Sequence, residues 1–126
     1  MSENSANSYT VLQLRFKLRV PPSVFLDHSR EAAALIASLE GLIWKIWILR
    51  EEELEIGGVY LFATRESAEA YLNHAVVQAV RSNPAVVSTQ SELWDVEGSL
   101  SAVTRAPLQE AIVRYENPVA ILAGGQ

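Results

Sequence analysis

The segment from Leu42 to Arg50 constrains the fold most strongly, because it carries large apolar side chains on both faces of an expected strand. Successive side chains of a strand point to opposite sides. Two apolar rows result, formed by Trp44, Ile46 and Ile48 on one face and by Ile43, Trp47 and Leu49 on the other. A large exposed apolar face usually marks a partner surface, so both faces of this strand are expected to be covered.

Three further strands are expected. Residues 10–18 alternate apolar and polar side chains, and Pro21 follows shortly after, which predicts a strand that ends there. Another strand, the third in chain order, is expected over 59–63, directly after Gly57 and Gly58. The last is expected over 86–96.

Two helices lie between these strands. Apolar residues at helical spacing predict a helix over 24–39, with Ser23 as its N-cap and Gly41 as the residue that closes it. The same spacing predicts a second helix over 64–81, capped by Thr64. A short helix is also expected within 98–105.

The order β-α-β-β-α-β predicts an α+β, ferredoxin-like fold with a four-stranded antiparallel sheet. Two helices can cover only one face of such a sheet, so we expect a second copy to cover the other face in a two-fold homodimer. Residues 10–106 form the expected domain, 1–9 a disordered lead, and 107–126 a C-terminal arm that docks on the domain or on the partner subunit.

Composition excludes several classes of function. A chain of 126 residues with a net charge of −5 and scattered basic residues does not suit nucleic-acid binding. It contains no cysteine and two histidines without a metal-ligand spacing, so we expect no metal and no cofactor. Its apolar runs are too short to span a membrane, and its first residues lack the features of a signal peptide. We therefore expect a cytoplasmic protein.

Several short motifs, taken together between Thr10 and Ala106, resemble the YdhR-type family of mono-oxygenases. They are Leu12–Leu14, Gly41–Trp47, Gly57–Phe62, Ser67–Leu72, Asp95–Val96 and Leu100–Ser101. The resemblance implies a dimeric α+β barrel related to the antibiotic-biosynthesis mono-oxygenases. That wider group includes cofactor-free oxygenases acting on electron-rich aromatic substrates, as well as haem-degrading enzymes, lyases and isomerases.

His74 and Tyr60 are the candidate catalytic residues. His74 is expected on the second helix, one turn after Tyr71, and the resemblance implies a pocket between this helix and the sheet. Imidazole exchanges protons near neutral pH, so His74 is the candidate general base. The Tyr60 hydroxyl could anchor a phenolic substrate or donate a proton to a developing oxyanion. The alternatives are a capping or solvent-facing histidine and a tyrosine bonded to a backbone carbonyl.

The candidate substrate-binding residues are mostly aromatic: Trp44, Trp47, Phe62, Tyr71 and Arg15. Trp44 and Trp47 are three residues apart, so they are expected on opposite faces of their strand. Arg15 could hold an anionic group, or it could pair with Glu92 across the sheet. Lys45 shares a side with Trp47, and in a mostly buried strand it either reaches an edge or pairs with a carboxylate such as Glu92. A catalytic role for Lys45 is not favoured, because the sequence shows no partner that would activate it.

These residues and the resemblance favour a cofactor-independent mono-oxygenase that acts on a hydrophobic, aromatic or polyketide-like small molecule with dioxygen. Two alternatives stay open. One is an isomerase, cyclase or lyase that uses the same pocket by proton abstraction. The other is a non-catalytic dimer that binds a ligand.

Overall fold

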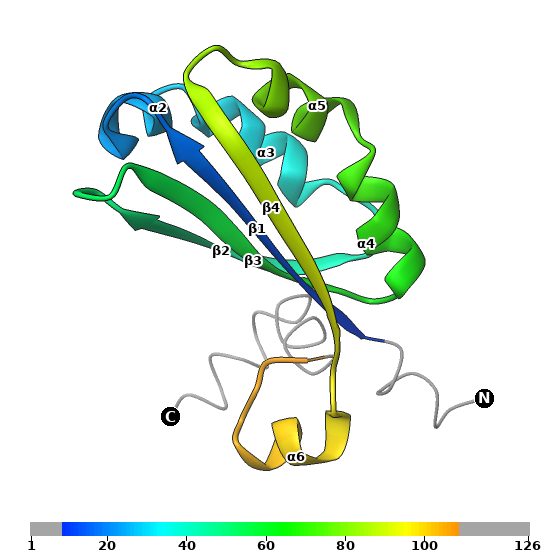
Figure 1. The fold of residues 1–126 in the computed structure, drawn as a ribbon. Helices are drawn as coiled ribbons and strands as arrows, with labels where there is room; N and C mark the ends of the chain where they lie inside the picture. The colour runs from blue at the N-terminus through cyan, green and yellow to red at the C-terminus, as the bar shows by residue number, and fades with distance from the viewer. Residues whose placement is uncertain (1–8, 109–126) are drawn as a thin grey trace, which may run out of the picture.

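In the computed structural model, which describes residues 9–108, four antiparallel strands form one sheet in the order β2-β3-β1-β4 (Figure 1). The strands are β1 (Thr10–Leu18), β2 (Leu42–Arg50), β3 (Glu55–Phe62) and β4 (Val86–Asp95). Helices α3 (Arg30–Ala37), α4 (Arg65–Leu72) and α5 (Ala75–Ser82) lie on one face of the sheet, while the short α2 (Pro22–Leu26) follows β1 and α6 (Gly98–Val103) follows β4. The predicted ferredoxin-like α+β fold is confirmed.

The core lies between the sheet and the helices. The apolar residues of β1 face the helices and are buried: Leu12, Leu14, Phe16 and Leu18. They belong to one cluster with Ile36 of α3, Tyr71 of α4 and Val77 of α5. Burial of this apolar surface is the main favourable contribution to folding, so β1, which has a neighbour on each side, anchors the domain.

Each of the two expected helices is divided into two shorter ones. The first helix begins at Pro22 rather than after an Ser23 cap, because proline suits the first helical position. It breaks after Leu26 and resumes at Arg30, and α3 ends at Ala37, before Gly41. The predictions of a single helix over 24–39, of a Ser23 cap and of Gly41 as the C′ residue that closes the helix are therefore wrong in detail.

The second helix begins as predicted. Thr64 accepts a hydrogen bond from the backbone N–H of Ser67, which confirms it as the N-cap. The helix then ends at Leu72, and His74 becomes the N-cap of α5 by accepting from the N–H of Val76. His74 therefore lies at a helix start, not on the inner face of a continuous helix.

Strand β3 is longer than expected, because Gly57 and Gly58 lie within it and do not precede it. A Cβ at Gly57 would lie 2.4 Å from the carbonyl oxygen of Leu14, and a Cβ at Gly58 would lie 2.5 Å from Cε of Lys45. Glycine inside a strand often marks such a close approach. The two glycines therefore let β1 and the Lys45 side chain approach β3 closely.

The two apolar rows of β2 point to opposite faces, as predicted. Trp47 lies opposite Gly58 on the helix side, and Ile46 lies opposite Val59 on the other side. No helix of the described range 9–108 covers this second face in Figure 1. Ile46 is 54% exposed and Trp94 of β4 is 55% exposed there. We call this surface, formed by Trp44, Ile46, Ile48, Val59 and Trp94 with interspersed polar residues, the open sheet face.

Most of the expected lead over 1–9 and of the expected arm over 107–126 lies outside the described residues. Tyr9 is described, and it is buried while its carbonyl accepts from the N–H of Val96, so it belongs to the domain and not to a disordered lead. No helix among residues 9–108 is long and apolar enough to cross a membrane.

Candidate functional site

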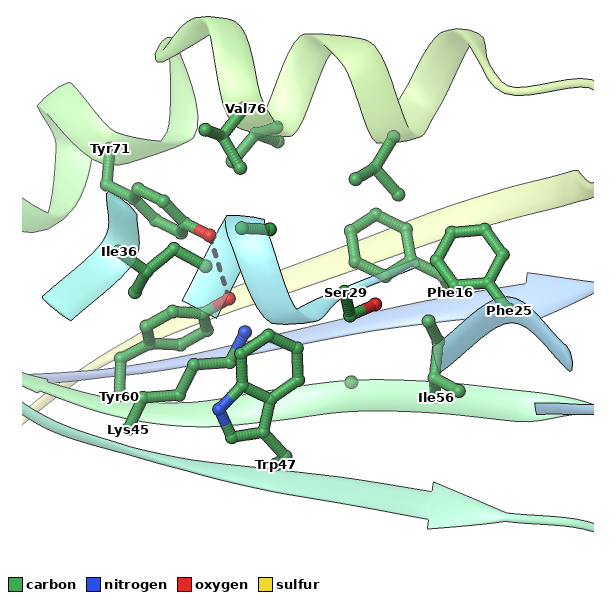
Figure 2. A pocket seen from close by; sticks show the side chains of 14 residues that line it. Phe16, Phe25, Ser29, Ile36, Lys45, Trp47, Ile56, Tyr60, Tyr71 and Val76 are labelled. Carbon is green, nitrogen blue, oxygen red and sulfur yellow. Dashed lines mark hydrogen bonds between the residues drawn. The ribbon is translucent and has the colours of Figure 1, made fainter. Parts of the chain in front are cut away.

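A small cavity lies between the helix-covered face of the sheet and helices α3 to α5 (Figure 2). Its volume is about 50 Å³, and its walls are mostly apolar. Five of its lining residues have polar side-chain atoms: Ser29, Lys45, Trp47, Tyr60 and Tyr71. Enclosed apolar pockets with a few convergent polar groups are typical of small-molecule sites. We call it the Lys45 pocket.

Tyr60 and Tyr71 form a hydrogen-bonded pair at this pocket. Their hydroxyl oxygens are 2.9 Å apart, and the two residues are 1% and 4% exposed. The two tyrosine ring centroids lie 5.0 Å apart, and the Phe62 ring stacks on the Tyr60 ring with its centroid 5.9 Å away. These contacts join β3 to α4 and fix both hydroxyls in place.

Both tyrosines remain protonated at neutral pH. Burial raises the pKa of Tyr60, and the nearby Tyr71 raises it further. Burial likewise raises the pKa of Tyr71, although its hydrogen bond with Tyr60 acts in the opposite direction. Two hydroxyls that share one hydrogen bond have a second O–H left to donate. The pair can therefore donate to an oxygen atom of a ligand, but it does not provide a base.

Lys45 is a charged residue of the pocket that was not among the site residues predicted from the sequence. It lies opposite Tyr60 in the β2–β3 register, so both side chains point to the helix side. Its Nζ lies 3.3 Å from the ring centroid of Trp47 and 4.7 Å from that of Tyr60. Burial lowers the pKa of Lys45 to about 7. At neutral pH this amine therefore exchanges protons readily, in a pocket with an apolar wall.

Of the two alternatives given for Lys45, pairing with a carboxylate such as Glu92 is wrong. Glu92 is on β4, where it lies opposite Gln13, whose side chain faces the open sheet face. Within residues 9–108, Lys45 has neither an ion pair nor a hydrogen bond at Nζ. Gly58, which lies opposite Trp47, was the feature of the sequence that could have indicated where the Lys45 side chain lies. Because Gly58 has no side chain, it leaves room for Lys45 of β2.

His74 and Tyr60 line different cavities, contrary to the prediction. His74 borders a neighbouring, more open hollow of about 410 Å³ together with Phe62 and Tyr71. Tyr71 lines both this hollow and the Lys45 pocket. Because Nδ1 of His74 accepts from Val76, a neutral imidazole carries its proton on Nε2. In this state the lone pair of Nδ1 is engaged and Nε2 is a hydrogen-bond donor, so His74 has no free lone pair with which to act as a general base.

Trp44 and Arg15 lie on the other side of the sheet from the pocket. The indole N–H of Trp44 donates to the carbonyl of Pro107 at 2.8 Å, and the Arg15 guanidinium donates to the side chain of Gln90. The anticipated Arg15–Glu92 pair is therefore replaced by an Arg15–Gln90 contact. Of the residues proposed for substrate binding, Trp47 and Tyr71 line the Lys45 pocket, together with Tyr60.

The described residues contain no group of three or more His, Cys, Asp or Glu side chains that could hold a metal ion.

Comparison with known proteins gives a family and a fold. The family described as "Putative mono-oxygenase ydhR" matches residues 11–107. No curated protein matches the chain. SnoaB, a cofactor-independent oxygenase from Streptomyces nogalater, is 13% identical with a TM-score of 0.58, covering 74% of this chain and 97% of that one.

Two further solved structures share the fold. The protein NE2512 of unknown function from Nitrosomonas europaea is 16% identical, with a TM-score of 0.64 over 75% of this chain and 94% of that one. The monooxygenase from the gene ActVA-Orf6 of Streptomyces coelicolor, solved with the ligand Nanaomycin D, is 11% identical, with a TM-score of 0.57 over 79% and 96%. At these identities the likeness establishes the fold.

Proposed function

This chain belongs to the ydhR mono-oxygenase family, and we propose that it is a cofactor-independent mono-oxygenase that acts on a hydrophobic aromatic or polyketide-like small molecule. The substrate binds in the Lys45 pocket, and dioxygen is the co-substrate. A cofactor-independent oxygenase with the same fold supports the reaction type.

The observation that carries the proposal is the buried hydroxyl pair at an otherwise apolar cavity. The Tyr60–Tyr71 pair keeps both protons, so its unshared O–H can donate to a substrate oxygen as negative charge develops there. A fixed donor in a site that excludes water stabilises charge more strongly than the same donor in solvent. The apolar walls select a flat, hydrophobic body.

The proposed reaction balances with dioxygen as the oxidant. A phenol or enol loses its O–H proton, and the resulting anion transfers one electron to dioxygen. The radical pair combines to form a carbon–oxygen bond, and the peroxide takes up a proton. The O–O bond then breaks as that carbon loses its C–H proton. One oxygen atom stays as a new carbonyl, and the other leaves as water.

The cavity must widen to accept an aromatic ring. Its volume of about 50 Å³ has room for a few water molecules, whereas a cavity that binds benzene has about 150 Å³. Trp47 is 39% exposed and forms the outer wall with Lys45, both on the edge strand β2. We expect these two side chains to move outward when a substrate enters, because the opposite walls belong to the core.

A second copy of the chain is proposed to cover the open sheet face. Ile46 and Trp94 on this face are more than half exposed, and a monomer would leave them in water. Self-association through a two-fold axis is the commonest way to cover such a surface. This arrangement corresponds to the dimeric α+β barrel.

Oxygen consumption tests the proposed reaction. Hydroxylated naphthalenes and anthracenes are incubated with the protein, and dioxygen uptake is followed with an electrode. We expect uptake, and labelled dioxygen should leave one heavy oxygen atom in the product. Of Tyr60→Phe and Tyr71→Phe, the variant that removes the hydroxyl donating to the substrate should lower turnover by roughly 10²-fold or more.

The same experiment separates the alternatives. Turnover that persists without dioxygen would favour an isomerase, cyclase or lyase that begins with the same proton abstraction. Ligand binding that raises the melting temperature without any turnover would favour a non-catalytic binding protein.

A further inference from the structure

We propose that Lys45 accepts the proton of a weakly acidic ligand and that the pocket binds phenols or enols as anions paired with the Lys45 ammonium group. This inference rests on the proposed function for the identity of the pocket, but it concerns binding and not oxygen chemistry. It also gives the site a base, which neither the tyrosine pair nor His74 supplies.

The first argument is charge balance. The pocket is lined by residues of α2, α3, α4, α5 and strands β1 to β3, and Lys45 is the one residue of this described lining that can be charged at neutral pH. The other titratable groups that face it are the hydroxyls of Tyr60 and Tyr71, and both stay protonated. A protonated Lys45 is therefore a partly buried cation without a counter-ion. An anionic ligand would complete the pair.

The second argument is geometry. The ring of Trp47 lies 3.3 Å from Nζ and the ring of Tyr60 lies 4.7 Å away, which favours the ammonium form by cation–π attraction. Gly58 leaves the space that the Lys45 side chain occupies, since a Cβ there would lie 2.5 Å from Cε. In Figure 2 the Lys45 amine points toward the tyrosine pair from the side of Trp47. A ligand oxygen between them would meet an ammonium and a hydroxyl donor.

The third argument is the cost of bringing a charge into the pocket. An anion must lose its hydration to enter an apolar cavity, which is expensive, whereas a neutral phenol enters more easily. Inside, the O–H bond breaks and an N–H bond forms on Lys45, so the pocket keeps zero net charge. The lowered pKa of Lys45 supports this step, because a large fraction of the amine is free near pH 7.

The probe for the test is 4-nitrophenol, a one-ring phenol whose visible absorbance appears on ionisation. Its methyl ether, 4-nitroanisole, has a similar shape and cannot ionise. Below the pH at which free 4-nitrophenol ionises, we expect the wild-type protein to bind it and to generate the absorbance of the anion. The ether should bind more weakly and show no such change.

Two variants make the test specific. The chain has two lysines, so Lys45→Met can be compared with Lys17→Met, which removes an exposed amine bonded to the carbonyl of Glu53. Lys45→Met should bind 4-nitrophenol roughly ten- to hundredfold more weakly and without ionisation, which corresponds to the loss of one charged hydrogen bond. Its affinity for 4-nitroanisole should be unchanged. Lys17→Met should behave like the wild type.

A spectroscopic titration keeps the test independent of the variants' folding. Reductive methylation with ¹³C-formaldehyde labels both lysines and the α-amine of Met1, and the three signals can be followed by NMR as the pH changes. We expect one of the two lysine signals to titrate near pH 7 and to shift when 4-nitrophenol binds. The α-amine ordinarily titrates at about pH 8, and its signal should not shift on binding.

Several results would overturn the inference. They are equal binding of phenol and ether by the wild type, an anion signal that survives in Lys45→Met, or two lysine signals that both titrate like exposed amines. If the phenol binds as an anion but oxygen uptake is absent, the mono-oxygenase proposal fails and this one stands.

Discussion

The hydroxyl of Tyr60 on β3 lies 2.9 Å from the hydroxyl of Tyr71 on α4, and this hydrogen bond joins the sheet to the helix layer inside the core. Each hydroxyl satisfies the other, and no buried side-chain nitrogen or oxygen of residues 9–108 lacks a partner. Removing one hydroxyl leaves its partner unsatisfied.

This pair should show strong coupling. Tyr60→Phe or Tyr71→Phe alone should lower the free energy of unfolding by about 1–3 kcal/mol, because one buried hydroxyl loses its partner. The double variant should cost less than the sum of the two, since it leaves no unpaired hydroxyl. Urea unfolding of the four proteins measures this, and strictly additive losses would contradict the bond.

Stability should rise with pH through the range set by Lys45. The pKa of this amine is about 7 in the folded protein and 10.5 when it is unperturbed, so between these values the unfolded chain binds more protons. The free energy of unfolding gained from this group therefore increases from about pH 7 toward pH 10.5 and is constant below pH 7. Urea unfolding of the wild type, Lys45→Met and Lys17→Met across this pH range measures the effect. Lys45→Met should lack the increase in stability, and Lys17→Met should keep it.

Gly58→Ala should disturb Lys45 and Tyr60 while leaving the backbone pairing intact. The new Cβ would lie 2.5 Å from Cε of Lys45 and 2.8 Å from Cε1 of Tyr60, so the flexible lysine is expected to move toward solvent. The Lys45 titration should then return toward that of an exposed amine. Gly57→Ala is the matched contrast, because its Cβ meets the Leu14 carbonyl, which cannot move aside, and we expect a larger loss of stability. Unchanged Lys45 titration in Gly58→Ala would argue against this role of the glycine.

His74→Ala should act mainly on stability. It removes the acceptor for the Val76 N–H at the start of α5, and loss of an N-cap costs about 0.5–2 kcal/mol. Thr64→Ala removes the equivalent cap of α4 and should cost a similar amount. Binding and ionisation of 4-nitrophenol should be unchanged in both. A fall in turnover of roughly 10²–10⁴-fold for His74→Ala alone would instead support the base role expected from the sequence.

The open sheet face should mediate dimerisation. Light scattering of the wild type should give a mass near twice the 13.9 kDa of one chain. Ile46→Glu places a charge in the middle of this face and should produce monomers, because a buried unpaired charge is costly. Leu35→Glu, at an exposed apolar position on α3, is the control and should remain dimeric. A wild-type protein that is monomeric at micromolar concentration would refute the proposed barrel.

The amino-acid sequence by itself determined the element order, the faces of the strands and the family. The period-two alternation of β1 and β2 is a local property of an extended chain, so the opposite placement of Trp44 and Trp47 could be read from their spacing. Thr64 was recognised as a cap for the same reason, since the cap and its helix are adjacent in sequence. The short motifs between Thr10 and Ala106 predicted the family, and the family match over residues 11–107 confirms it.

Tertiary structure alone decided which of these residues meet. His74 was misplaced because the helix breaks after Leu72, and the break is stabilised by the histidine's own bond to Val76. Lys45 was given no role because its neighbours, Trp47 on the same strand and Tyr60 on the next, define a pocket only once β2 and β3 are in register over Gly58. Desolvation of an amine depends on everything packed around it, so its shifted pKa is a property of the fold and not of the local sequence.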